Sequence, residues 1–291
     1  MAQVKERVDV YSLVTDKIIE QLENNIVPWQ QPWKDNSIPQ NLSTGKPYRG
    51  INLLLLGTLR YDQNLFLTFN QLKEIGGSVK KGEKGHLIIF WKPTVKTIKE
   101  NDKEDLEMSF VLRYYKVFNV AQCESIPPHV IEETTEIPFS PISYCEQILE
   151  EMEHCPKIIY EAQQAFYEPV SDYINMPKPE TFVTNEDFYS VLFHELVHST
   201  GHASRLGRDG VVTTSRFGDY TYSLEELTAE IGSCFLGSLC GLGANNFDQS
   251  VSYIKGWLKA LKNDKKLIIK AGGQAQKATD YILNVRQLVE E

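Results

Sequence analysis

The pattern His-Glu-Leu-Val-His at residues 194–198 constrains this chain more than any other part of it. On an α-helix, His194 and His198 lie one turn apart and project from the same face. Both imidazoles can therefore bind one Zn²⁺ ion or another divalent metal, with Glu195 beside the water that shares the site. The chain has only 6 histidines, so this spacing is improbable by chance. It predicts a helix that carries a metal site.

The residues around the pattern predict that this helix is buried. Thr184 or Asn185 can cap its start, and Gly201 suits its end. Apolar side chains cover much of the surface between them: Phe188, Val191, Leu192, Leu196 and Val197. The structural alternative is a core helix whose histidines are merely hydrogen-bonded. Burying two histidines and a glutamate is costly without a metal or a polar network, which favours the metal.

A catalytic zinc site needs a third protein ligand and an open position. A third histidine at the usual spacing would occupy position 204, which is Ser204, and His202 follows the glycine that ends the helix. Glu226 is the better candidate, because a carboxylate from a later helix completes sites of the His₂Glu type. Glu230, one turn further, would orient a histidine from behind the metal. If Glu226 instead forms a capping box with Ser223, Glu230 becomes the expected ligand.

These residues are typical of peptide-bond hydrolysis. Glu195 has the place of a general base that takes a proton from the attacking water. Tyr222 can stabilise an oxyanion if it overhangs the cleft. Metallopeptidases of the zincin type have a β-strand beside the metal cleft, where a peptide substrate pairs as an added strand. Residues 165–168 are the candidate strand, so a protein or peptide is the expected substrate.

The composition predicts a soluble globular protein. The chain has 291 residues, of which 42% are hydrophobic and 11% aromatic, which is enough for two packed domains. No apolar run is long enough to span a bilayer, and the first part of the chain is charged, so we expect neither a signal peptide nor a membrane partner. The 5 cysteines show no C-x-x-C spacing and are expected to be reduced thiols in a cytoplasmic protein.

The net charge of −9 is unevenly distributed along the chain. Lys and Arg slightly outnumber Asp and Glu in residues 1–126, whereas the remainder carries the acidic excess. A segment rich in Glu and Pro separates the two parts. We therefore expect an α+β fold with two domains: residues 1–126 face DNA, residues 127–141 form a linker, and residues 142–291 hold the metal.

Hydrophobic periodicity predicts the main elements. The front half is expected to contain helices at 9–25, 52–59 and 69–75, strands at 65–68, 87–91 and 108–120, and a charged hairpin or loop at 92–107. The back half is expected to contain helices at 144–153, 223–241, 250–261 and 274–289, strands at 157–160 and 165–167, and an extended segment at 171–177.

Basic and aromatic residues in the front half are candidate DNA contacts. Proteins bind single-stranded DNA with lysines and arginines that neutralise phosphates and with aromatic rings that stack on bases. The candidates are Trp33, Lys46, Tyr48, Arg49, Lys80, Lys81, Lys84 and Trp91. As alternatives, Trp33 packs an irregular loop onto the core, and the glycine turn that holds the three lysines is only a solvated hairpin loop.

Several segments, taken in order, carry a resemblance to a known family. They are PWQQPW, TGKPYRGIN, VKKGEKG, IIFW and YYKVFNVAQ in the front half, and DYINMP, HELVHSTGHASRL and EELTAEIGSCFL in the back half. Over nearly its whole length the chain resembles ArdC-type antirestriction proteins of plasmids and other mobile elements.

The resemblance implies an N-terminal α+β domain that binds single-stranded DNA without sequence preference. It further implies a C-terminal zincin-like metallopeptidase domain, the two together protecting incoming DNA from host restriction. Two rival hypotheses remain: a DNA-binding protein whose metal is purely structural, and a DNA-recruited peptidase that cleaves proteins bound to DNA.

Overall fold

A computed structural model describes most of the chain: residues 9–29, 38–59, 61–100, 103–127, 141–213, 220–242 and 251–285. Some expectations above fall outside these ranges, namely Trp33, most of the linker (residues 128–140) and the last part of the predicted helix 274–289, residues 286–289. Within the described residues, no helix is both long and apolar enough to cross a membrane. All 5 cysteines are free thiols, as their spacing predicted.

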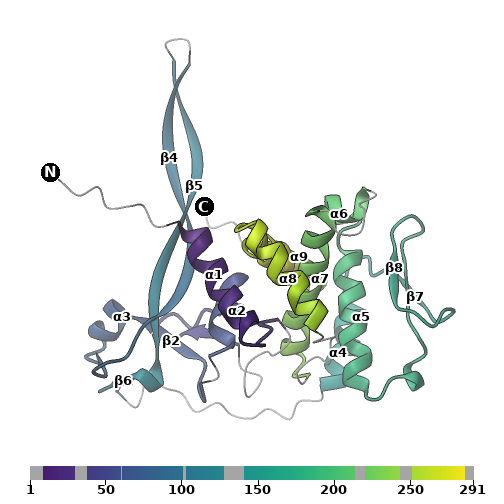
Figure 1. Ribbon diagram of the computed structural model, residues 1–291, viewed down its shortest axis with the longest axis horizontal. Coiled ribbons are helices and arrows are strands. Elements are labelled where there is room, and N and C mark those ends of the chain that lie inside the picture. The colour runs from purple at the N-terminus through teal and green to yellow at the C-terminus, as the bar shows by residue number, and fades with distance from the viewer. Residues whose placement is uncertain are drawn as a thin grey trace.

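The front half is built on a four-stranded sheet in the order β1-β2-β5-β4. Its strands are β1 (Gln40–Asn41), β2 (Leu65–Thr68), β4 (His86–Glu100) and β5 (Lys103–Asn119). β4 and β5 pair antiparallel from His86↔Val117 to Glu100↔Lys103. The charged segment 92–107 is therefore a hairpin rather than a loop, and Figure 1 shows it extending well away from the body of the molecule. A separate two-stranded sheet pairs β3 (Ser78–Val79) with β6 (Cys123–Glu124).

Helices cover this sheet where the periodicity predicted them. α1 (Val10–Glu23) begins at Asp9, whose side chain accepts a hydrogen bond from the backbone of Tyr11. α2 (Ile51–Gly57) is buried over its whole length. α3 (Phe69–Glu74) starts with a capping box between Thr68 and Gln71. Such caps satisfy backbone N–H groups that the first turn of a helix leaves without partners.

The back half combines helices with a three-stranded sheet in the order β7-β9-β8. Its elements are α4 (Pro141–Glu151), β7 (Lys157–Ile159), β8 (Phe166–Glu168), β9 (Tyr173–Asn175), α5 (Asn185–Ser199), α6 (Asp209–Val212), α7 (Tyr220–Leu239), α8 (Val251–Asn263) and α9 (Leu267–Ile282). In Figure 1 the small sheet lies beside α5, on the side away from the long hairpin. β8 is an edge strand of that sheet.

The last helix begins earlier than its predicted start at Gln274. Gly272 and Gly273, just before that predicted start, both lie inside α9. A Cβ at Gly272 would lie 3.1 Å from the backbone nitrogen of Ile51, so the glycine permits close approach to α2 instead of ending the helix. Leu267 and Ile268 in its first turn are fully buried, which explains why the helix extends to them.

The two halves share a hydrophobic core. One cluster of buried side chains draws on α1, α2, β4, α7, α8 and α9: its members include Val14, Ile18, Leu54, Ile88, Leu227, Phe235, Leu261 and Ile268. A second cluster surrounds α5 and includes Leu192, Phe193, Leu196, Ala229, Leu236 and Ala278. Side chains of α7 and α9 belong to both clusters, so these two helices join the sheet of the front half to the helix that carries His194 and His198.

Candidate metal centre

α5 carries the His-Glu-x-x-His pattern, as its spacing predicted. Thr184 is the N-cap residue, and its hydroxyl accepts a hydrogen bond from the backbone nitrogen of Asp187 at 3.0 Å. The helix ends at Ser199. Gly201 lies just beyond, but it does not adopt the left-handed conformation typical of a glycine stop. It is instead a packing residue, because a Cβ there would lie 2.5 Å from a methyl group of Val211.

Three side chains from two helices converge on one point. The Nε2 atoms of His194 and His198 are 3.1 Å apart. The carboxylate of Glu226, on α7, lies 3.8 Å from Nε2 of His194 and 3.7 Å from Nε2 of His198. These ligand atoms all lie within 4.8 Å of one another. A tetrahedral zinc site separates its ligand atoms by roughly 3.3 Å, so the three residues fit a divalent metal with little adjustment.

The other candidate ligands lie elsewhere. His202 hydrogen-bonds through Nδ1 to the hydroxyl of Ser204 at 2.7 Å and is not part of the converging group. Ser223 lies inside α7, which begins at Tyr220, so it does not cap that helix and leaves Glu226 available to the metal. Glu230 also lies outside the group: its carboxylate accepts a hydrogen bond from the hydroxyl of Tyr253 at 3.1 Å.

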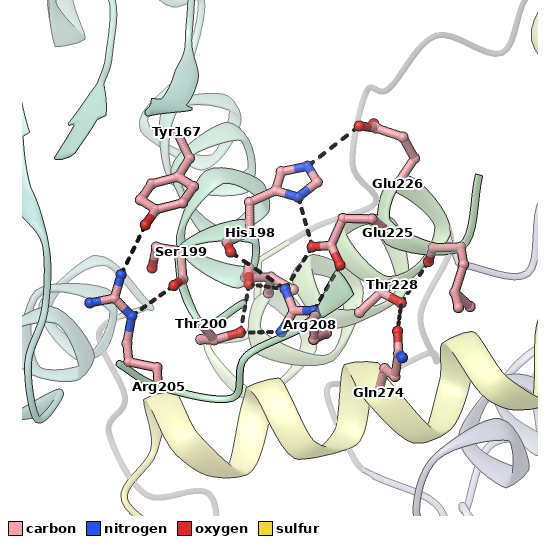
Figure 2. Close-up of polar contacts among 12 residues, drawn as sticks. Tyr167, His198, Ser199, Thr200, Arg205, Arg208, Glu225, Glu226, Thr228 and Gln274 are labelled. Carbon is pink, nitrogen blue, oxygen red and sulfur yellow. Dashed lines mark hydrogen bonds and ion pairs between the residues drawn. The ribbon is translucent and has the colours of Figure 1, made fainter. Parts of the chain in front are cut away.

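Glu225 supports His198 from behind the site, a role that the sequence suggested for Glu230. Its carboxylate lies 3.0 Å from Nδ1 of His198, which directs Nε2 toward the other two ligands. Arg208 binds the same carboxylate through two nitrogens, at 2.6 and 2.8 Å. The guanidinium also donates to the hydroxyl of Thr200 and to the carbonyl oxygen of Val197, at the end of α5. Figure 2 shows this chain of contacts from Arg208 through Glu225 to His198 and Glu226.

Electrostatics prepare this site for a cation. Burial and the charge of the neighbouring His198 lower the pKa of His194 to about 3. Burial also acts to lower the pKa of His198, but the hydrogen bond and charge of Glu225 outweigh it and raise that pKa to about 9. Despite its burial, Glu225 has a pKa lowered to about 2 by its hydrogen bonds with Arg208 and His198. Because their Nε2 atoms face each other at 3.1 Å, the two imidazoles disfavour two protons there, and a divalent cation would bind both of them.

Comparison with known proteins places this site in a family. A family model described as the N-terminal domain of the anti-restriction factor ArdC matches residues 8–118, and one described as a zincin-like metallopeptidase matches residues 144–274. The crystal structure of the antirestriction protein ArdC from plasmid R388, in its metal-free form, shares 36% identity, covers 94% of this chain and 97% of its own, and superimposes with a TM-score of 0.75. The chain belongs to the ArdC family of antirestriction proteins.

Other proteins are also similar to this ArdC-family chain. The Mn(II)-bound structure of R388 ArdC has a TM-score of 0.72 and the same 36% identity, covering 95% of this chain and 98% of its own. The uncharacterized protein y4eC of Sinorhizobium fredii is 31% identical over 94% of this chain and 91% of its own length. Two proteins named DNA primase TraC, both from Escherichia coli, are 33% and 32% identical over 99% and 95% of the chain. The chain spans only 28% and 20% of their respective lengths.

In this ArdC-family chain, Glu195 faces the cavity that contains the metal ligands. The cavity has a volume of about 760 Å³, and Tyr167, Val211 and Tyr222 also line it. Burial raises the pKa of Glu195, and the backbone N–H of Tyr167 hydrogen-bonds to its carboxylate. A carboxylate with a raised pKa beside the ligands has the properties of a general base. Tyr222 lies close to Glu226, and burial raises the pKa of its hydroxyl.

The edge strand β8 runs along this cavity and is tied to α5. Its residues Phe166 and Tyr167 line the cavity, and β9 pairs with its other edge. Arg205 donates to the hydroxyl of Tyr167 at 3.1 Å and to the carbonyl oxygen of Ser199 at 2.7 Å, and it forms an ion pair with Asp172. Figure 2 shows Arg205 between β8 and the end of α5. These contacts hold β8 against the end of α5, beside the cavity that His194 and His198 line.

The candidate DNA contacts of the ArdC-type front half fall into two places. Lys46, Tyr48, Arg49 and Trp91 line a second cavity, which lies between the sheet and α9. Tyr48 is buried and packs against Phe66, so its ring is less open than the sequence suggested. The second group is the turn that connects β3 to β4: Lys80, Lys81 and Lys84 are exposed there, and none of them lines the cavity.

Proposed function

We propose that this ArdC-family protein is a metal-dependent peptidase that also binds single-stranded DNA without sequence preference. The convergence of His194, His198 and Glu226 around one point, with Glu195 in the same cavity, carries the peptidase half of the proposal. Zn²⁺ is the expected ion, because two histidines and one carboxylate form the donor set of His₂Glu peptidases. A relative binds Mn(II). The test of metal identity must therefore include both ions.

Each residue of the site then has a definite task. The bound cation supplies Lewis acidity, which polarises a carbonyl group and makes a water more acidic. Glu195 accepts a proton from the attacking water and passes it to the departing amine. Tyr222 faces the same cavity and is the candidate donor to the oxyanion. Glu225 and Arg208 hold His198 in one orientation while the proton moves.

The substrate class follows from β8. An edge strand has backbone N–H and C=O groups that do not pair within its own sheet, and an extended peptide can pair with them. β8 lies directly beside Glu195, whose carboxylate its backbone already contacts. A peptide added to β8 would therefore cross the cavity close to the histidines. We infer that the substrate is an unfolded or extended segment of a protein.

The DNA-binding half of the proposal rests on the front of the molecule. The ArdC N-terminal family match covers it, and its exposed residues combine lysines with half-exposed aromatic rings such as Phe90 and Trp91. Counterion release from phosphates and stacking on unpaired bases both follow from these side chains. Affinity should therefore fall steeply with salt and be higher for single strands than for duplex.

Metal analysis of purified variants tests the site. We expect about one equivalent of metal in the wild type, loss of the metal in His194→Ala and His198→Ala, and much weaker binding in Glu226→Ala. Glu195→Gln should retain the metal and lose peptidase activity on an unfolded protein substrate, because Glu195 acts on the water. His202→Ala is the matched control and should retain both. Stoichiometric metal in His198→Ala would refute the site.

A binding assay with the same proteins tests the second half. Glu195→Gln should bind a labelled single-stranded oligonucleotide as the wild type does, because the metal cavity and the front surface are separate. A wild type that holds the metal but cleaves no unfolded protein substrate would favour a purely structural metal. Peptidase activity that appears only when single-stranded DNA is present would favour the DNA-recruited peptidase.

A further inference from the structure

The cavity between the front sheet and α9 has walls from both halves of the chain. Its volume is about 630 Å³. Lys46 and Arg49 line it from the segment before α2, and Phe90 and Trp91 line it from β4. Gln276 and Lys277 line it from α9. Neither of these two α9 residues falls within the ranges that the family models match.

Specific contacts hold α9 at this cavity. The side-chain oxygen of Gln276 accepts a hydrogen bond from the backbone nitrogen of Gly50 at 2.8 Å. Arg49 forms an ion pair with Asp280, one turn beyond Gln276. Gly272 approaches α2 so closely that a Cβ on it would lie 3.1 Å from the backbone nitrogen of Ile51. The wall that α9 contributes is therefore a fixed part of the front surface.

The charges and rings of this cavity match single-stranded nucleic acid. Lys46 and Lys277 are exposed, on different walls. Trp91 is about half exposed, at 50%, so its ring offers surface that a base can cover, whereas Phe90, the next residue on β4, projects from the opposite face of the strand. Asp280 neutralises part of the charge of Arg49, and Lys277 is an exposed cation on the wall that α9 contributes. A strand that places a phosphate at Lys277 can bring a base to the ring of Trp91.

We propose that α9 is part of the single-stranded DNA site, with Lys277 contacting a phosphate and Trp91 stacking on a base. The inference rests on the proposed DNA binding and goes beyond it, because it assigns part of the site to the C-terminal half. It also links the two sites physically. On its other side α9 contacts α7, where the hydroxyl of Thr228 donates to Gln274 at 3.1 Å, one turn from Glu225 (Figure 2).

Fluorescence anisotropy of the full-length protein with a labelled oligothymidine tests this assignment. Lys277→Glu should weaken binding by about three- to tenfold at moderate salt. The slope of log affinity against log salt concentration should also become shallower by the equivalent of about one phosphate contact. Lys259→Glu, on the exposed surface of α8, makes the same change in net charge and should leave affinity within about twofold of the wild type. Trp91→Ala should weaken binding at every salt concentration, because stacking does not depend on counterions.

The outcomes separate this inference from the function on which it rests. A wild-type protein that does not bind the oligonucleotide would remove the proposed DNA binding itself. A wild type that binds, with Lys277→Glu equal to Lys259→Glu, would overturn only the role of α9. Weaker binding of Lys277→Glu with an unchanged melting temperature and unchanged metal content would support it, because neither folding nor the metal centre would then explain the loss.

Discussion

At the scale of single residues, the metal centre depends on a carboxylate that does not touch the metal. Glu225 connects the buried guanidinium of Arg208 to His198 and keeps the ring in one orientation. Glu225→Gln preserves the shape but removes the charge, so we expect metal affinity to fall by about 10- to 100-fold. Calorimetric titration of the metal-free protein with Zn²⁺ measures it. Glu186→Gln, at an exposed glutamate in the first turn of α5, should bind as the wild type does.

A second residue, Glu230, is expected to make the free energy of unfolding depend on pH. Burial raises the pKa of Glu230 to about 7, and its Oε2 atom has no hydrogen-bond partner among the described residues. The folded pKa lies above the ordinary value of 4.5, so the folded state holds a proton that the unfolded chain has lost. Protonated Glu230 therefore contributes to the free energy of unfolding. This contribution is fully present below pH 4.5 and is lost as pH rises through about 7.

Urea unfolding of the wild type and of Glu230→Gln, from pH 4.5 to 7.5, tests this linkage. The wild type should lose up to about 3 kcal/mol relative to the variant across that interval, because each unit of pKa shift corresponds to about 1.4 kcal/mol. The glutamine cannot ionise, so the variant should lack this dependence. Parallel curves for the two proteins would show that Glu230 titrates normally in the folded state.

At the residue scale, the metal ligands could be predicted because histidine and glutamate occur at a distinctive spacing. His194, His198 and Glu226 follow from the helical repeat and from the known donor sets of metals. Glu225 could not be chosen over Glu230, because residues five positions apart on a helix point about 140° apart and the sequence does not show which face meets α5. That choice depends on the packing of α7 and on Arg208, a residue from a loop.

At the scale of elements, the end of α5 is set by packing against α6. Gly201 leaves room for Val211 and Arg208, so Gly201→Ala should push them away and lower stability by about 1–3 kcal/mol. Gly256→Ala is the control: it lies on α8 with open space around it and should be neutral or slightly stabilising. Thermal unfolding of both variants measures the difference. Equal melting temperatures would show that the turn after α5 is not tightly packed.

Local signals account for the elements that could be predicted. α1, α3 and α5 have caps and clear periodicity, and each begins within a residue or two of its predicted start. The extent of β4 and β5 was not evident, because their outer part is rich in charge and forms strands only by pairing with each other. The early start of α9 depends on its contact with α2, which is distant in sequence and leaves no periodic signal.

At the scale of the whole molecule, the shared core limits how far the halves can act separately. Charge distribution assigned DNA binding to residues 1–126. In the structure α1 and α2 bury Ile18, Leu54 and other apolar side chains in a cluster with α7, α8 and α9. We therefore expect the 1–126 fragment to unfold at lower temperature than the full chain and to bind the oligonucleotide more weakly. Circular dichroism and anisotropy test both, and a fragment equal to the full chain would contradict them.

The close approach of Gly272 to Ile51 also restricts how such genes can recombine. A crossover between two relatives within residues 128–140 would leave each matched segment intact and yet combine an α2 from one parent with an α9 from the other. The hybrid would assemble only if both parents keep small residues at the contact and complementary charges at Arg49 and Asp280. The two halves of this protein are therefore expected to be inherited together.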